Sequence, residues 1–431
     1  MTARVSLARL RQLREYRCRF RCHLEASTGG HMRLRPAALA IGCAMLAVAA
    51  CSSGGAPSGA GSAPPGEPIV FGVQQDANGP SSSYSVITTQ AIKDAATRIN
   101  SQGGILGRPV EVKVASDDSD PTRAPAVTRQ LLEGGADVMF FTTSAGAAIQ
   151  SKPLVYEAHV PSFAPTTFST NLIAAPQGDY SFLIANGTPD VAKLYADAFK
   201  AAGITRIAVF SDASPTIAAI NKVLIPGITG AGIEVVSTEQ APADAGDVSA
   251  QVQRIASARP QAILLSTLGG PIEALFHNTA YLQTPEIPRF SLASIGNQPD
   301  VWDQVQPDAL NGVVFIASLT DKNPRTADLG EYLKGERSDF TRLTAYDAQG
   351  YDAAYLAKTA IEKAGSPDDG TAVAKAIEGI TDYQPHFGQA GYTLRFGADD
   401  HDGSNGPCGM ILTEFTGNEP GEPWSRYQPS C

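Results

Sequence analysis

The chain has 431 residues, of which 43% are apolar and 18% charged, and its net charge is -10. This length exceeds one small domain and fits two medium-sized lobes, and the apolar content excludes a disordered chain. The charge is uneven, because residues 1–50 carry a net charge of +7 and the remainder carries -17. A body this acidic argues against nucleic acid as a partner, since phosphates require a basic surface.

The first 50 residues have the composition of a secretory signal peptide. Two arginines precede an apolar run over 37–50, which ends in the small residues Val-Ala-Ala before Cys51. A basic segment, a short apolar stretch and small residues before the cleavage point are typical of such signals, and this run is too short to span a bilayer. We predict a signal peptide over 1–50, with translation starting either at Met32 or at the first residue.

Cys51 is the residue directly after the expected cleavage point. Its position resembles the bacterial lipobox, in which this cysteine is acylated and becomes the first residue of the mature protein. Residues 51–68 then form a lipidated cysteine and a tether rich in Ser, Gly, Ala and Pro, a composition typical of flexible linkers. We expect a lipid anchor on the outer face of the cell membrane. The alternative is an ordinary signal peptide with an incidental cysteine.

Only two cysteines, Cys408 and Cys431, lie in the body of the chain after Cys51. Two cysteines in the last part of an exported chain are expected to pair as a disulfide, and the alternative is two free thiols. No Cys or His spacing matches a metal site, and the acidic run at 399–402 is expected to be a solvated turn. We therefore predict no metal and no cofactor.

From Ile69 onward, short apolar runs alternate with amphipathic stretches. The apolar runs predict strands at 69–73, 110–115, 138–141, 162–164, 206–210, 234–237 and 262–266. Helical periodicity and glycine stops predict helices at 86–100, 124–133, 147–159, 190–202, 216–230 and 248–258. Repeated β-α-β units predict parallel sheets covered by helices on both faces, in two α/β lobes around a cleft. Near the end, 392–415 predicts antiparallel strands around a turn at 397–403.

Several short strings stand at the ends of these predicted elements. An N-x-x-G-G-I-x-G string begins at Asn100, and a D-D-x-D-P string begins at Asp117. Further strings occupy 78–84, 143–145 and 165–167. Over roughly residues 69–420, their order and spacing resemble the Leu/Ile/Val type of periplasmic solute-binding protein.

This resemblance implies the type I periplasmic binding protein fold. That fold has two Rossmann-like lobes with parallel sheets around a ligand cleft, joined by three crossovers, here near 185–190, 317–322 and 386–390. The first lobe would comprise 69–187 plus 320–388, and the second 188–319 plus 389–431. Ligands of such folds are held between the lobes, which close over them.

The resemblance also assigns ligand-binding residues on the first lobe. Ser144 matches a serine whose hydroxyl meets the ligand carboxylate at a helix start, with Ala145 beside it. Its alternative role is to cap its own helix. Thr166 and Thr167 match positions that give backbone and hydroxyl contacts, or are ordinary turn residues. Tyr84 matches an aromatic that covers the ligand, or is a surface tyrosine at a helix start.

The second lobe departs from the family pattern. The loop after the strand at 206–210 lacks the Tyr-Gly of the amino-acid binders, and 293–297 lacks the acidic residue that holds the ligand ammonium. Asp212 is a candidate substitute counter-ion, or a solvated turn residue, and Asn297 is a candidate amide contact. A buried ammonium without a carboxylate is costly, so a carboxylate, an amide or another neutral molecule is as plausible a ligand as an amino acid.

The resemblance implies a function without catalysis. We expect an extracytoplasmic, monomeric, lipid-anchored binding protein that delivers a small polar molecule to an ABC permease in the membrane. One alternative is a ligand-sensing receptor subunit of the same fold. Another is an extracytoplasmic hydrolase, which would need a nucleophile motif such as G-x-S-x-G, and the sequence has none.

Overall fold

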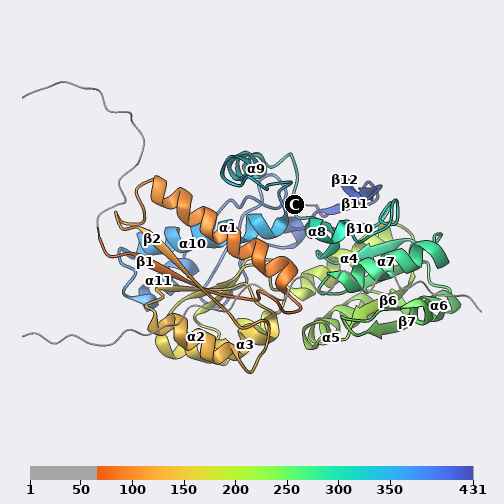
Figure 1. The fold of residues 1–431 in the computed structure, drawn as a ribbon, viewed down its shortest axis with the longest axis horizontal. Helices are drawn as coiled ribbons and strands as arrows, with labels where there is room; N and C mark the ends of the chain where they lie inside the picture. The colour runs from red at the N-terminus through yellow and green to blue at the C-terminus, as the bar shows by residue number, and fades with distance from the viewer. Residues whose placement is uncertain (1–65, 431) are drawn as a thin grey trace, which may run out of the picture. The chain divides into compact units, whose positions relative to one another are not determined.

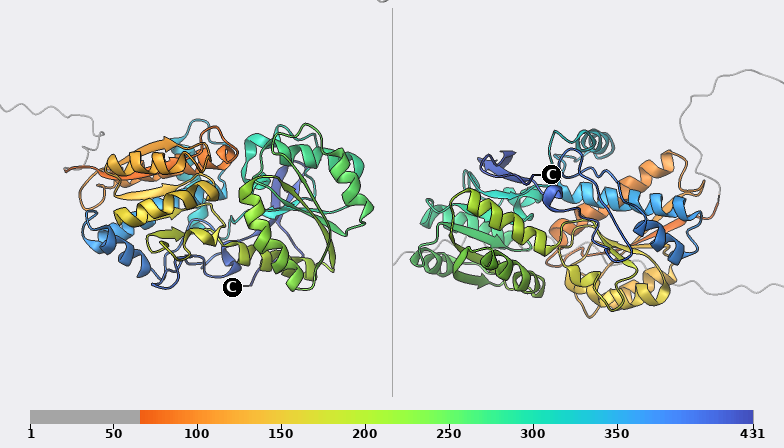
Figure 2. Two further views of the ribbon diagram at one scale, coloured as in Figure 1. Left: turned by 90° about the horizontal axis from the view of Figure 1, so that it is seen from below. Right: turned by 180° about the vertical axis from the view of Figure 1, so that it is seen from behind.

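The computed structural model describes residues 66–430 (Figures 1 and 2). The predicted signal peptide and most of the tether, with Cys51, lie outside the described residues, as does Cys431. No helix between residues 66 and 430 combines the length and the hydrophobicity needed to cross a bilayer. The described chain folds around two sheets, each with its own helices.

The first sheet has the strand order β2-β1-β3-β4-β5, and all of its neighbouring strands are parallel. Its strands are β1 (Ile69–Gln75), β2 (Val110–Ser116), β3 (Val138–Phe141), β4 (Ser162–Ala164) and β5 (Ser181–Leu183). In β1, Ile69, Phe71 and Val73 lie in one core cluster and Val70 in another. Successive side chains are thus buried on opposite faces, which explains why residues 69–73 of this strand carry no polar side chain.

Helices cover both faces of the first sheet (Figure 1). One face carries α1 (Ser82–Ser101), α9 (Pro324–Glu336), α10 (Ala345–Ala364) and α11 (Gly370–Glu378), and the other carries α2 (Ala124–Glu133) and α3 (Ala145–Ala158). Helices α1 and α10 approach closely at Gly350, where an added Cβ would lie 2.5 Å from the carbonyl oxygen of Thr88. The glycine therefore permits this helix contact.

The second sheet has the order β12-β11-β10-β9-β8-β6-β7. Its strands are β6 (Arg206–Asp212), β7 (Glu234–Ala241), β8 (Ala262–Ser266), β9 (Arg289–Ser291), β10 (Val314–Ile316), β11 (Leu412–Thr416) and β12 (Glu419–Pro423). The pairs from β7 to β10 are parallel, and β11 and β12 add an antiparallel hairpin. Helices α4 (Thr188–Ala201) and α5 (Pro215–Gly230) cover one face, and α6 (Ser249–Ser257) and α7 (Pro271–Gln283) the other; the short α8 (Pro299–Trp302) follows β9 (Figure 2).

Every strand and helix predicted between residues 69 and 266 is present, with ends shifted by at most a few residues. An antiparallel pair of strands was predicted within 392–415, and this position is wrong. The hairpin is β11–β12, which turns at Gly417 and Asn418. The segment 397–403 forms two isolated bridges, one between Gly397 and Asp400 and one between Asp402 and Leu183.

The chain passes three times between the two cores. The first passage joins β5 to α4, and the second joins β10 to α9. In the third, Cys408 still belongs to the core of the first sheet, and Met410 belongs to that of the second. The predicted division placed 389–431 in the second lobe, whereas the apolar side chains of Tyr392, Leu394 and Phe396 pack into the first core.

Cys408 is disulfide-bonded. It is the only cysteine within residues 66–430, so its partner lies outside the described residues. The pairing with Cys431 therefore stays a prediction.

Candidate functional site

The order of strands reverses at one point in each sheet. In the first sheet this point lies between β1 and β3, and in the second it lies between β6 and β8. Open α/β sheets bind ligands beyond the carboxyl ends of the strands at such reversals. A cavity of about 50 Å³ lies at both reversals at once, because segments that follow β1, β3, β6 and β8 all line it.

Two tyrosines from the first lobe line this cavity. Tyr84 lies in the first turn of α1 and Tyr346 in the first turn of α10, and their ring centroids are 5.6 Å apart at an interplanar angle of 45°. Burial raises the pKa of both phenols well above the usual value. Both hydroxyls therefore stay neutral and are able to donate or accept a hydrogen bond.

The turn from β3 into α3 brings Ala145 to the cavity. Ser144, one residue earlier, caps α3, and its hydroxyl accepts a hydrogen bond from the backbone N–H of Ala147 at 3.3 Å. Ser144 is buried but is not among the residues that line the cavity. The capping role is thus present in the structure, and the predicted ligand contact of Ser144 stays a prediction.

Thr166 and Thr167 follow β4 and line the same cavity. Within residues 66–430 neither hydroxyl has a hydrogen-bond partner. Thr167 is buried and Thr166 is half-buried. Two uncommitted hydroxyls next to the start of α3 suit a polar ligand group.

The second lobe supplies residues that sequence reasoning missed. Thr216 and Ile217 come from the first turn of α5, Thr267 follows β8, and Ser294 follows β9. Their common signal is position directly after a strand of the parallel sheet, the same signal that was used on the first lobe. The loop after β8 offered no aromatic or charged residue to draw attention to it.

The two predicted second-lobe residues form hydrogen bonds within the protein and do not reach the cavity. The carboxylate of Asp212 accepts hydrogen bonds from the backbone N–H groups of Ser214 at 2.9 Å and Leu268 at 2.7 Å. Asn297 donates to the carbonyl oxygens of Ala293 and Ile316, and it accepts from the N–H of Ala345 at 2.9 Å. Neither residue lines the cavity. Asp212 orders two loops at its wall, and Asn297 links the second lobe to the start of α10.

Glu273 is a further buried group that the sequence reading passed over. It lies in the first turn of α7, is fully buried, and accepts hydrogen bonds from the hydroxyls of Thr267 and Ser294. An acid among apolar residues on the buried side of a helix is the signal that could have revealed it.

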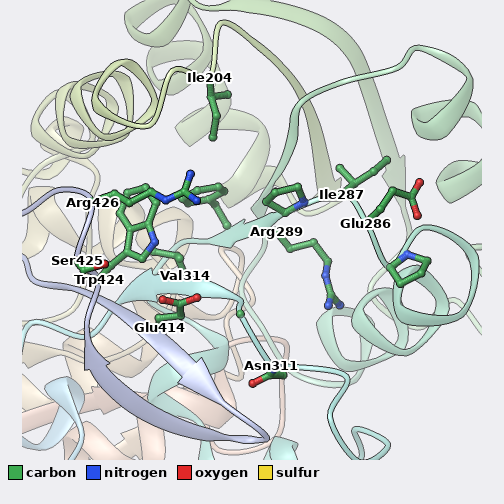
Figure 3. A pocket seen from close by; sticks show the side chains of 14 residues that line it. Ile204, Glu286, Ile287, Arg289, Asn311, Val314, Glu414, Trp424, Ser425 and Arg426 are labelled. Carbon is green, nitrogen blue, oxygen red and sulfur yellow. The ribbon is translucent and has the colours of Figure 1, made fainter.

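A larger cavity of about 430 Å³ lies in the second lobe at the opposite, amino ends of the strands (Figure 3). Residues 285–290, around the start of β9, and Glu414 of β11 line it, together with Trp424. Arg289 is buried there, and burial lowers the pKa of its guanidinium to about 10. This is not the end of a parallel sheet at which such folds bind ligands, so the smaller cavity is the candidate site.

Metal binding finds no support in the described part of the chain. No group of three or more His, Cys, Asp and Glu side chains between residues 66 and 430 is placed to hold an ion.

Comparison with known proteins gives one family match and several similar proteins. The family described as periplasmic binding protein matches residues 68–417. The Leu/Ile/Val-binding protein BraC3 of Rhizobium johnstonii is 25% identical over 334 residues, covering 75% of this chain and 87% of its own.

Two solved structures share the fold. A type 1 periplasmic binding protein of Bordetella pertussis superposes with a TM-score of 0.72 at 20% identity, covering 83% of this chain and 100% of its own. The branched-chain amino acid transporter substrate-binding protein LivJ of Streptococcus pneumoniae, in complex with isoleucine, has a TM-score of 0.70 at 17% identity, covering 82% and 98%. These similarities confirm the predicted type I fold.

Proposed function

Because the chain belongs to the periplasmic binding protein family, we propose that it captures a small polar molecule between its lobes and delivers it to an ABC permease. The observation that carries this proposal is the cavity at which the strand reversals of both sheets meet. The relatives are binding proteins, which argues against the alternative of an extracytoplasmic hydrolase.

The lining of the cavity supports a ligand that is partly apolar. Ile217, Ile220, Leu268 and Leu292 stand among the threonine and serine hydroxyls. The similar proteins are named for Leu, Ile and Val, or hold isoleucine. The proposed ligand class is an amino acid, an amide or a small carboxylate.

A lipid anchor at Cys51 is part of the proposal. It rests on the Val-Ala-Ala-Cys junction and the Ser/Gly/Pro-rich residues that follow it. The test is the intact mass of protein extracted from membranes, which should equal the chain from Cys51 plus acyl groups. An unmodified amino terminus would contradict the anchor. The Cys51→Ser variant should be released or left unprocessed.

A ligand screen tests the capture function. Thermal shift against amino acids, amides and small carboxylates should show at least one compound that raises the melting temperature, because a ligand stabilises the state that binds it. Tyr84→Ala should weaken calorimetric binding of that compound by about 10- to 150-fold, since it removes a buried aromatic contact. Tyr156, which is 36% exposed and lies outside the cavity, provides the matched Tyr156→Ala control. If the screen gives no hit, or if both variants bind equally, the proposal fails.

A further inference from the structure

A carboxylate lies directly behind the second-lobe wall of the cavity. Glu273 is 0% exposed, and three hydroxyl groups donate hydrogen bonds to it. Thr267 Oγ1 donates over 2.7 Å and Ser294 Oγ over 2.6 Å, both to Oε2, and Ser291 Oγ donates to Oε1. Thr267 and Ser294 line the cavity, whereas Ser291 does not.

These bonds fix the polarity of the wall. A hydroxyl group has one hydrogen and two lone pairs, and both Thr267 and Ser294 donate that hydrogen to Glu273. The hydrogens of Thr267 and Ser294 are therefore committed to Glu273. One lone pair of Thr267 accepts from the backbone N–H of Gly269 at 3.1 Å. These two hydroxyls can therefore only accept hydrogen bonds from a ligand.

His277 and Arg289 lie behind Glu273 inside the second lobe. His277 Nε2 lies 3.7 Å from Glu273 Oε1, and Arg289 Nη1 lies 3.2 Å from His277 Nδ1. Because arginine only donates, Nδ1 accepts and the ring proton sits on Nε2, facing Glu273. Burial lowers the pKa of His277, so the ring stays neutral. Arg289 also lines the larger cavity shown in Figure 3.

We propose that Glu273 sets the ligand preference of the site, an inference that rests on the proposed capture function. An acceptor-only wall backed by a carboxylate suits a ligand group with N–H donors, such as an ammonium or an amide, and disfavours a carboxylate there. An acidic ligand group instead faces the first lobe, where α3 begins with a partial positive charge. The ligand class is thereby narrowed to small molecules with nitrogen donors at the end that meets Thr267 and Ser294.

Matched ligands of one carbon skeleton test this preference by calorimetry. The pairs are L-leucine with 4-methylpentanoate, L-alanine with propanoate, and isobutyramide with isobutyrate. In any pair that binds, the nitrogen-bearing member should bind the native protein at least about tenfold more tightly. Glu273→Gln keeps the side-chain shape but removes the charge and brings its own donor. In that variant the difference should fall to about threefold or less.

Two serine variants separate ligand preference from structural support. Ser294 and Ser291 both donate to Glu273, but only Ser294 faces the cavity. Ser294→Ala should reduce the difference in affinity between the two ligands of a pair, and Ser291→Ala should leave that difference unchanged. These variants decide the matter even where Glu273→Gln does not fold.

The outcomes distinguish this inference from the function on which it rests. The role of Glu273 is wrong if both members of a pair bind the native protein equally. It is also wrong if the difference in affinity survives in Glu273→Gln and Ser294→Ala. Neither result contradicts the capture function. Binding of no member of any pair counts against this role, and an empty ligand screen counts against the capture function as well.

Discussion

Two serines begin the helices that reach the cavity from the strand reversals. Ser144 caps α3, and Ser214 caps α5 by accepting a hydrogen bond from the N–H of Ile217 at 3.2 Å. Loss of either cap should lower the free energy of unfolding by about 1 kcal/mol. We predict that Ser144→Ala also weakens ligand binding by about tenfold or more, because the family resemblance aligns its hydroxyl with one that meets a ligand carboxylate.

Ser214→Ala is the control for this prediction, and it should change stability alone. Urea unfolding gives the stability of both variants, and calorimetry gives their affinities. Equal affinities in the two variants would leave Ser144 with the capping role only.

Individual residues of the candidate site could be predicted well on the first lobe and poorly on the second. Tyr84, Ala145, Thr166 and Thr167, which the resemblance assigned to the ligand, line the cavity, whereas Ser144 does not. Asp212 has a polar side chain at a comparable strand end, yet backbone N–H groups use its carboxylate. Whether a polar group is free or already bonded depends on loops distant in the sequence, which local patterns do not contain.

Among the elements, the contact between α1 and α10 depends on a missing side chain. An added Cβ at Gly350 would meet the backbone of Thr88, which cannot shift easily. We predict that Gly350→Ala lowers the free energy of unfolding by about 1–3 kcal/mol, as expected for overpacking.

Gly330, inside α9, is the matched control because an added Cβ there meets nothing within 4 Å. Gly330→Ala should stabilise the protein by up to about 1 kcal/mol, since alanine favours the helix. Thermal unfolding of both variants is the measurement. A stabilised Gly350→Ala variant would contradict the close packing.

The apolar runs up to residue 266 were predictable, whereas later elements, including the long helix α10, were not predicted. The strands β1, β3 and β8 are continuous apolar runs, buried on both faces, and the prediction placed each of them. Strand β5 has three residues and was missed, although β4, which is equally short, was predicted, so length alone does not explain the miss. The hairpin was misplaced because alternating residues at 392–396 pack against the first core instead of pairing in a ladder.

On the scale of the whole molecule, two of the passages between lobes lie side by side. An added Cβ at Gly409, in the third passage, would lie 2.5 Å from Oδ1 of Asn186, in the first, and one at Gly187 would lie 3.0 Å from Oδ2 of Asp402. Burial raises the pKa of Asp402 to about 6, from the ordinary value of an aspartate. The folded state therefore holds this proton more tightly than the unfolded state, so this group makes the protein less stable as the pH rises from about 4 to above 6.

We predict that Asp402→Asn raises the melting temperature near pH 7 and leaves it unchanged near pH 4, because it removes this penalty. Asp399→Asn, at an exposed position nearby, is the control and should have no such pH-dependent effect. Melting curves between these two pH values are the measurement. An equal shift at both ends would show that charge burial at Asp402 is not the cause.

The tail of the chain offers a second prediction for the whole molecule. We predict that Cys408 pairs with Cys431, closing a loop of about 24 residues and adding roughly 3 kcal/mol of stability in the chain-entropy model. Trp424, in the core of the second sheet, lies within this loop. Thiol labelling of unreduced, denatured protein should find neither cysteine, and reduction should lower the melting temperature. Labelling of Cys431 would refute the pairing.

Strand β12, at one edge of the second sheet, affects how readily copies of the protein would aggregate at high concentration. β12 contains Pro420 and Pro423, which have no N–H to donate, and its other residues include two glutamates. An open strand edge ordinarily invites a strand from another molecule, and prolines and charges on it discourage such aggregation. The lipid anchor proposed at Cys51 would concentrate copies of the protein at a membrane, and this edge would then discourage strand pairing between them.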